Sequence, residues 1–283
     1  MKEPMGLTEQ LLFATVRIEA DTPDGTSVGT GFMFRFSVDK EKGIPVIVTC
    51  KHVVESTTRG RFKLHLASKG EPRVPSGESR FVELNSFSQR WVPHPNAEVD
   101  LCAMPLAPLL GEAERQSLSP FFVSLDERLL PSPEELDQLQ AVESVLMVGY
   151  PTGLWDKVNN FPLFRRGITA SHPAFDYQGK CITVVDMACF PGSSGSPVLL
   201  ADQGAYTTKK GGVAIGTRAK LLGVLFQGPT LSAEGKIVIE DIPTSQRASA
   251  LTKVMIHLGF IIKSRELGPL GDRLRQLAAG ASS

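Results

Sequence analysis

A segment rich in glycine and serine at residues 190–200 could supply a catalytic nucleophile. Its sequence, "FPGSSGSPVLL", places Ser193, Ser194 and Ser196 around two glycines and beside two prolines. A serine hydroxyl becomes an effective nucleophile when a base takes its proton and a third group orients that base. Clusters of glycine and serine are also common in loops without chemistry. The rest of the chain must therefore supply a base and an orienting acid.

The best candidate for the base is His52, one of five histidines in the chain. It follows the apolar segment "VIVTC", so a rigid strand could present its imidazole, although a core histidine would fit the same pattern. The other four histidines occupy positions that are common for histidines without a catalytic role. His65 lies on the polar face of a predicted strand, His94 and His172 precede prolines, and His257 falls in a predicted helical turn.

The best candidate for the orienting acid is Asp100, which directly precedes the apolar segment "LCAMPLA". A carboxylate at such a border can be partly buried, and it then needs a partner such as an imidazole N–H. In chain order the candidates are His52, Asp100 and the serine cluster. Chymotrypsin has this His–Asp–Ser order, whereas α/β-hydrolases have the order Ser–Asp–His.

Three segments carry a family resemblance. "VTCKHVV", "EVDLCAMPL" and "FPGSSGSPV" resemble the signature segments of the trypsin-like (chymotrypsin-fold) serine proteases, and "GTGFMF" resembles a strand of their bacterial HtrA-like members. With "MVGYP" and "RRGITAS", the resemblance spans roughly residues 10–260. It implies an all-β fold of two antiparallel six-stranded β-barrels, with the active site in the cleft between them. Too few residues follow the last predicted helix for a PDZ domain, so we expect a form without one.

The resemblance also assigns roles to residues. Only Ser194 fits the family pattern Gly-x-Ser-Gly-x-Pro. It implies that His52 is the general base, that Asp100 orients it, and that Ser194 forms an acyl-enzyme with a peptide carbonyl. The backbone N–H groups of Gly192 and Ser194, with Ser193 between them, are the expected oxyanion hole. We expect the acid limb of the pH–rate profile to reflect His52, at about pH 6–7.

The resemblance further suggests a substrate preference. Trypsin-like cleavage after Lys or Arg depends on an acid six residues before the serine, and here that position holds Ala188. We therefore expect a neutral pocket that prefers small or apolar P1 residues. The wall strand of the pocket is expected in "GVLFQGP", with Phe226, Gln227 and Gly228 as substrate-binding residues.

Short apolar segments with a period of two dominate the chain, as in half-buried antiparallel strands. They suggest an N-terminal barrel in residues 1–115 that carries the histidine and the aspartate. A linker with a short helix follows in 116–142. A C-terminal barrel with a helix in 143–262 carries the serine, and a helical tail ends the chain in 263–283.

The residue pattern of two further segments also predicts local structure. Leu251, Val254, Met255 and Leu258 follow helical spacing, which predicts a helix that Thr244 or Ser245 caps and Gly259 ends. The long connection at 202–220 is either a functional loop beside the site or a surface insertion.

The composition of the chain limits the kinds of partner and cellular location that we expect. Thirty basic and thirty acidic residues balance to zero net charge, which argues against nucleic acid and anionic membranes as partners. We see no signal peptide, no apolar run near the ~20 residues of a membrane span, and no metal motif. We therefore expect a cytoplasmic protein with four reduced cysteines and no metal or cofactor. Its expected partners are a peptide or protein substrate and a regulatory protein.

Three rival interpretations can be compared with the same residues. An α/β-hydrolase esterase needs G-x-S-x-G, but Ser196 occupies the last position; a 3C-type cysteine protease needs a cysteine at position 194. The third is a trypsin-fold module that binds peptides and is catalytically silent or activated by a partner. The presence of His52, Asp100 and Ser194 disfavours this interpretation without removing it.

Overall fold

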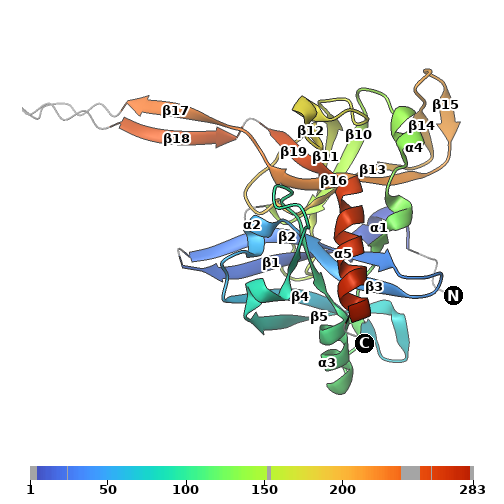
Figure 1. Cartoon of the computed structure of the whole chain (residues 1–283), viewed down its shortest axis with the longest axis vertical. Coiled ribbons are helices and arrows are strands. Elements are labelled where there is room, and N and C mark those ends of the chain that lie inside the picture. The colour runs from blue at the N-terminus through green and yellow to red at the C-terminus, as the bar shows by residue number, and fades with distance from the viewer. Residues whose placement is uncertain (1–4, 24, 152–153, 237–248, 256, 281–283) are drawn as a thin grey trace, which may run out of the picture.

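The computed structural model describes residues 5–23, 25–151, 154–236, 249–255 and 257–280. Two β-rich units lie one above the other, and the long C-terminal helix α5 runs across both (Figure 1). The predicted mostly-β fold of chymotrypsin type with a C-terminal helix is confirmed. Of the two expected six-stranded barrels, the C-terminal unit is a closed six-stranded barrel, whereas the N-terminal unit is a nine-stranded sheet, because two short strands pair with it outside its main strand order.

The N-terminal sheet follows the order β5-β4-β1-β2-β3-β7-β6, while β8 pairs with β4 and β9 pairs with β2. Its strands are β1 (Thr15–Thr22), β2 (Gly25–Ser37), β3 (Gly43–Thr49), β4 (Arg59–Ser68), β5 (Glu71–Asn85), β6 (Val92–Pro93), β7 (Cys102–Pro105), β8 (Pro120–Phe121) and β9 (Leu125–Asp126). Alternation along β2 buries Phe32, Phe34 and Phe36 completely, in keeping with the predicted period of two, whereas Val38 lies beyond the end of the strand and is exposed.

Four helices accompany these strands: α1 (Leu7–Leu12), α2 (Lys51–Val54), α3 (Ala107–Arg115) and α4 (Pro133–Asp137). Helix α4 is the short helix expected in the linker. The Ser132 hydroxyl accepts from the Glu135 N–H, and the Glu135 carboxylate accepts from the Ser132 N–H. This reciprocal capping explains why so short a helix forms there.

The C-terminal barrel closes in the order β10-β11-β12-β19-β16-β13. Its strands are β10 (Ser144–Gly149), β11 (Leu163–Thr169), β12 (Ile182–Asp186), β13 (Pro197–Asp202), β16 (Arg218–Gln227) and β19 (Leu258–Lys263). Buried apolar side chains fill the barrel, among them Met147, Val198 and Ile261. This barrel positions the serine segment, because residues 187–196 connect β12 to β13.

One continuous core joins the two units. The cluster that holds Phe34 and Ile47 of the N-terminal sheet also contains Leu199 and Val224 of the barrel. Helix α5 (Leu267–Gly280) buries Leu267, Leu270 and Leu274 in the same cluster. A side chain at Gly271 would lie 2.5 Å from the Phe36 ring, so glycine allows α5 to pack this closely on β2.

The helix predicted to start at Thr244 or Ser245 and run through Leu258 is wrong. Ser249–Met255 form strand β18, which pairs with β17 (Thr230–Lys236), and Leu258 begins β19. This hairpin extends far from the barrel (Figure 1), whereas the proposed cap residues fall outside the described part of the chain. Hydrogen bonding to the preceding strand of the hairpin overrides the local helical spacing.

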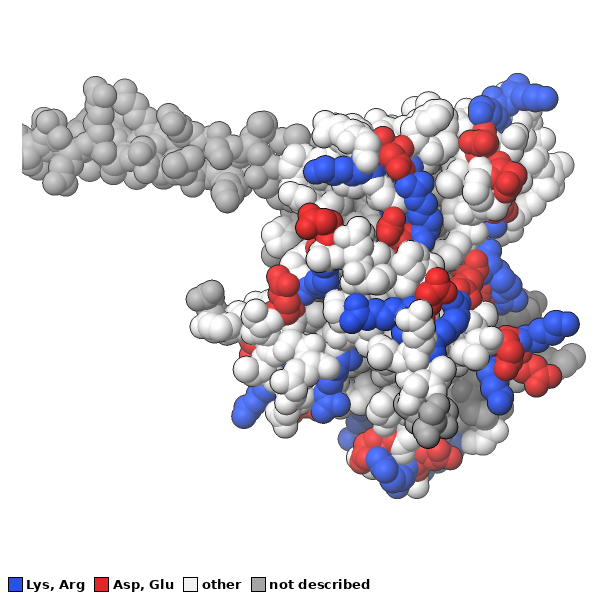
Figure 2. All heavy atoms as spheres, in the orientation of Figure 1, with Lys and Arg blue, Asp and Glu red and all other residues white. Residues whose placement is uncertain are grey.

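The connection at 202–220 contains a second hairpin, formed by β14 (Ala205–Thr207) and β15 (Val213–Ile215). On the face shown in Figure 2, basic and acidic side chains are intermingled, in keeping with the balanced composition. All four cysteines are unpaired. Among the described helices, none is both long and apolar enough to cross a membrane.

Candidate active site

His52 and Asp100 come from neighbouring strand ends of the N-terminal sheet. His52 lies in the one-turn helix α2, immediately after β3, and Asp100 lies just before β7. Thr49 at the end of β3 pairs with Cys102 at the start of β7. The antiparallel pairing therefore brings the two side chains to the same edge of the sheet.

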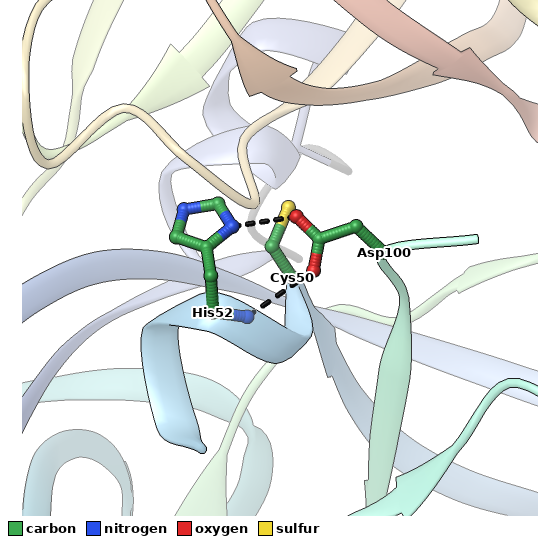
Figure 3. A group of neighbouring side chains, drawn as sticks. All are labelled: Cys50, His52 and Asp100. Atoms are coloured by element: carbon green, nitrogen blue, oxygen red, sulfur yellow. Dashed lines mark hydrogen bonds and ion pairs between the residues drawn. The ribbon is translucent and has the colours of Figure 1, made fainter. Parts of the chain in front are cut away.

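The Asp100 carboxylate contacts His52 at two points (Figure 3). Its Oδ2 lies 2.5 Å from Nδ1 of the imidazole, and its Oδ1 accepts from the His52 backbone N–H at 3.1 Å. The Asp100 side chain is 25% exposed and the His52 side chain 43% exposed. The carboxylate thus fixes the ring from the Nδ1 side and leaves Nε2 for another partner.

Cys50 lies beside this pair (Figure 3). One ligand atom from each of Cys50, His52 and Asp100 lies within 4.8 Å of the other two, which is metal-like spacing. However, the Cys50 thiol donates to the Leu225 carbonyl at 3.4 Å, and Nδ1 of His52 is taken by Asp100. Burial, and next the Asp100 charge, raise the pKa of Cys50 well above its usual value. A protonated thiol is a poor metal ligand, so the trio fits a hydrogen-bonded cluster better than a metal centre.

The three serines of the candidate nucleophile segment differ sharply in exposure. Ser193 and Ser196 are fully buried, and their hydroxyls have no hydrogen-bond partner among the described residues. Ser194 is half-buried and therefore accessible. It is the serine that the family pattern selects.

Thr30 on β2 holds this segment in place. Its N–H donates to the Ser194 carbonyl at 2.8 Å, and its hydroxyl donates to the Gly192 carbonyl at 3.0 Å. The same hydroxyl accepts from the Tyr150 N–H at 3.0 Å, and the Thr30 carbonyl accepts from Thr49 Oγ1 at 2.7 Å. Thr30 is fully buried, and its N–H, hydroxyl and carbonyl all form hydrogen bonds with other residues, as buried polar groups usually do. Sequence reasoning missed this residue, and only its place in "GTGFMF" hinted at a role.

The backbone of the segment leaves two N–H groups available. Gly192 has φ 89°, which glycine adopts without strain. Ser193 N–H donates to the Phe190 carbonyl at 3.0 Å and Gly195 N–H to the Leu225 carbonyl at 2.7 Å. Within the described chain, Gly192 and Ser194 N–H make no hydrogen bond. Of the three residues expected to form the oxyanion hole, Ser193 thus has its N–H engaged elsewhere.

The Leu225 carbonyl connects the serine segment to the histidine. It accepts from Gly195, next to Ser194, and from Cys50, two residues before His52. Among the described residues, Ser194 Oγ and His52 do not hydrogen-bond to each other. In proteases without bound substrate, such bonds are often long and tighten when substrate binds.

The residues expected to line the P1 pocket lie on two segments that meet at Gly259. A side chain at Gly259 would lie 2.6 Å from Cys189 Sγ and 2.7 Å from Leu225. Ala188, Phe226 and Gly228 are half-buried, and Gln227 is exposed. Phe226 also packs against the main core.

A cation from β11 contacts Phe190, two residues after Ala188. The Arg165 guanidinium lies 4.9 Å from the centre of the Phe190 ring, and the His257 ring lies 5.8 Å away on T-shaped geometry. Cys189 adds no charge, because burial raises its pKa to about 11. His257 precedes β19 and is not helical, which corrects its predicted position.

The other histidines have structural environments. His65 is buried between Phe13 and Phe161 rather than on a solvated face, because the segment before β11 covers it. His94 is buried, and its Nε2 lies 3.1 Å from the Glu266 carbonyl, which anchors the start of the C-terminal tail.

Comparison with known proteins places this chain in a family. The model of the trypsin-like peptidase domain matches residues 29–206. No curated protein sequence matches the chain.

Several solved structures have a similar course of the chain. The serine endoprotease from Yersinia pestis is 13% identical with a TM-score of 0.48, over 97% of this chain and 68% of that one. The inactive form of the Rv3671c protease from M. tuberculosis is 16% identical with a TM-score of 0.44, over 94% and 91%. The HtrA-type protease AlgW with a tripeptide is 12% identical with a TM-score of 0.43, over 90% and 58%.

The family match extends over more than half of the chain and includes the segments that hold His52, Asp100 and Ser194. The chain therefore belongs to the trypsin-like peptidase family and is a serine protease.

Proposed function

We propose that the protein is an endopeptidase that cleaves peptide bonds with a Ser194–His52–Asp100 triad. Ser194 attacks the carbonyl carbon while Nε2 of His52 takes the hydroxyl proton. The imidazolium then passes this proton to the leaving amine, and water releases the acyl group in a second, equivalent step.

The observation that carries the proposal is the double contact between Asp100 and His52. Oδ2 at 2.5 Å from Nδ1 favours the tautomer with the proton on Nδ1, so Nε2 keeps its lone pair for the serine. Oδ1, bound to the His52 N–H, prevents the carboxylate from turning away. An aspartate in this position also stabilises the imidazolium as it forms.

The proposed oxyanion hole consists of the N–H groups of Gly192 and Ser194. The Thr30 hydroxyl binds the Gly192 carbonyl, and the Thr30 N–H binds the Ser194 carbonyl. These contacts fix the peptides 192–193 and 194–195. The Ser194 N–H lies in the peptide between these two, and the Gly192 N–H lies in the peptide just before them, so the contacts support a fixed direction for both donors. Such donors stabilise the charge that develops on the carbonyl oxygen in the transition state.

The proposed P1 pocket has a neutral floor at Ala188 and a wall at Phe226, Gln227 and Gly228. Without an acid at the floor, cleavage after Lys or Arg loses its main charge partner, and small or apolar P1 residues are favoured. Arg165, behind Phe190, adds positive charge to this region and further disfavours basic P1 residues.

A fluorophosphonate probe tests the proposal because it reacts with an activated serine and needs no knowledge of the substrate. The wild-type protein should be labelled at Ser194, whereas Ser194→Ala and His52→Ala should remain unlabelled, with folding checked by circular dichroism. Absence of labelling in folded wild type would instead support the silent or partner-activated peptide-binding module.

A further inference from the structure

A hollow of about 170 Å³ lies between the N-terminal sheet and the segment that follows β10. Strands β1, β4 and β5 supply one side of it, and residues 155–160 supply the other. Four cationic side chains line it against one acidic side chain; the cations are Arg17, Arg61, Lys63 and Lys157, and the acid is Glu19. In a chain with no net charge, this is a local excess of positive charge.

The charges in the hollow are incompletely neutralised. Glu19 forms ion pairs with both Arg17 and Arg61, so one carboxylate serves two guanidinium groups. Burial, and next the Arg61 charge, lower the pKa of Arg17. The Arg17 Nε is also buried without a hydrogen-bond partner among the described residues. An anion bound here would relieve both the charge repulsion and the unsatisfied donor.

Aromatic rings hold the remaining cations near the opening. The Lys63 ammonium lies 4.7 Å from the centre of the half-exposed Phe81 ring, and the Lys157 ammonium lies 5.2 Å from the Trp155 ring. Arg17 covers the same Trp155 ring at 4.1 Å. Neither lysine has an ion pair within the described chain, so both can bind an incoming anion.

The hollow adjoins the candidate active site. Arg17 pairs directly with Thr30 across β1 and β2, and residues opposite each other in an antiparallel pair point to the same face. On that face the Thr30 hydroxyl binds the Gly192 carbonyl of the nucleophile segment. A chain that occupies the hollow therefore lies one strand away from the loop that carries Ser194.

We propose that this hollow is an exosite that binds a carboxylate-rich peptide segment of the substrate, outside the residues around the scissile bond. Glutamate or aspartate side chains would enter between Trp155 and Phe81. Their carboxylates would take the free donors of Arg17, Lys63 and Lys157. The substrate assignment rests on the proposed endopeptidase activity, whereas the binding of an acidic segment does not.

Peptide fits these observations better than nucleic acid. The hollow has the size of one or two side chains, and guanidinium groups match the planar fork of a carboxylate. Single-stranded nucleic acid needs a longer charged groove with several stacking platforms.

Binding can be measured without catalysis. Fluorescein-labelled octaglutamate is titrated into Ser194→Ala protein and followed by fluorescence anisotropy. We expect saturable binding that weakens with added salt, and about tenfold weaker binding after the double change Lys63→Glu and Lys157→Glu. The control, Lys40→Glu with Lys210→Glu, changes net charge equally at exposed sites elsewhere and should leave the affinity within about twofold.

Several results would overturn the proposal. Absence of saturable binding would refute it, and so would an equal loss of affinity in the two double variants, because only overall charge would then matter. Tighter binding of octathymidylate than of octaglutamate would assign the hollow to nucleic acid instead. Native circular dichroism of both variants guards against unfolding.

Cleavage assays then separate this proposal from the proposed function. Quenched peptides with and without a glutamate tract should differ about tenfold in kcat/KM through KM, because binding remote from the reacting bond tightens substrate and transition state together. Lys63→Glu with Lys157→Glu should remove this difference and leave the peptide without the tract unaffected. Octaglutamate binding without any cleavage would refute only the endopeptidase; cleavage that ignores the tract would refute only the exosite.

Discussion

Thr30→Val removes one buried hydroxyl from the contact between the nucleophile segment and β2 while nearly preserving the shape of the side chain. The hydroxyl donates to the Gly192 carbonyl and accepts from the Tyr150 N–H, and both residues are buried. Two hydrogen bonds are lost, and a carbonyl and an N–H are left without partners. At about 1–2 kcal/mol for each orphaned group, the free energy of unfolding should fall by about 2–4 kcal/mol.

Thr30→Val should also lower kcat by more than the loss of folded protein can explain. Once the Gly192 carbonyl is free, the peptide between Gly192 and Ser193 can rotate. The N–H groups of Gly192 and Ser194 belong to the peptides on either side of it, so both proposed donors would lose their fixed direction toward the oxyanion position. Loss of one such donor lowers kcat by about 10²–10³-fold. KM should change little, because the donor acts mainly on the transition state.

Urea denaturation and peptide-cleavage kinetics on the same preparations measure both effects. Thr30→Ser is the matched control because it keeps the hydroxyl and loses only a methyl group, so its kcat should stay within about threefold of wild type. If Thr30→Val retains wild-type kcat while losing stability, the hydroxyl does not position the oxyanion hole. If it loses neither, the inferred contact is unimportant.

Three further predictions concern single side chains. Burial lowers the pKa of His65 in the folded protein, so on acidification the unfolded state binds a proton at this imidazole before the folded state does. The free energy of unfolding should therefore fall as the pH drops below about 6.5. Urea titrations at several pH values should show this slope, and His65→Phe should flatten it. Cys50 is fully buried and its pKa is raised, so iodoacetamide should modify it only after unfolding. Rapid modification of the folded protein in peptide maps would contradict this. A peptide library varied at P1 should show the same preference for small or apolar residues in the wild type, in Arg165→Gln and in the exposed control Arg166→Gln. If the wild type instead prefers acidic P1 residues and only Arg165→Gln abolishes that preference, the Arg165 guanidinium lies inside the pocket.

The parts of the site that depend on local spacing could be predicted from the sequence. Gly192, Gly195 and Pro197 around Ser194 form a pattern within six residues, and an apolar strand beside a histidine or an aspartate is visible in a short window. The period of two along β2 likewise marks Phe32, Phe34 and Phe36 as buried, because a strand alternates its faces regardless of what covers them.

Features that depend on which other segment a residue contacts could not be predicted. The hydroxyl of Thr30 meets a carbonyl 162 residues away, and no local pattern encodes that contact. Leu251, Val254 and Met255 have helical spacing, yet their backbone pairs with β17, because hydrogen bonding between strands outweighs a weak local propensity. The Ser193 N–H was assigned to the oxyanion hole from its position alone, whereas a turn to Phe190 determines its direction.

The proposed triad can form only where the two units meet. His52 and Asp100 lie on the N-terminal sheet, and Ser194 lies on a connection of the C-terminal barrel. Beside the continuous core, buried hydrogen bonds join the two units, among them those of Thr30 with Gly192 and Ser194, of Cys50 with Leu225, and of the Tyr150 hydroxyl with the Thr15 carbonyl. Buried hydrogen bonds tolerate little displacement, so even a small shift of one unit against the other would separate the base from the nucleophile. The exosite lies across the same boundary, since Arg17 of β1 stacks on Trp155 of the second unit. An acidic segment bound there would favour the joined arrangement, and substrate binding would then align the triad as well as deliver the peptide.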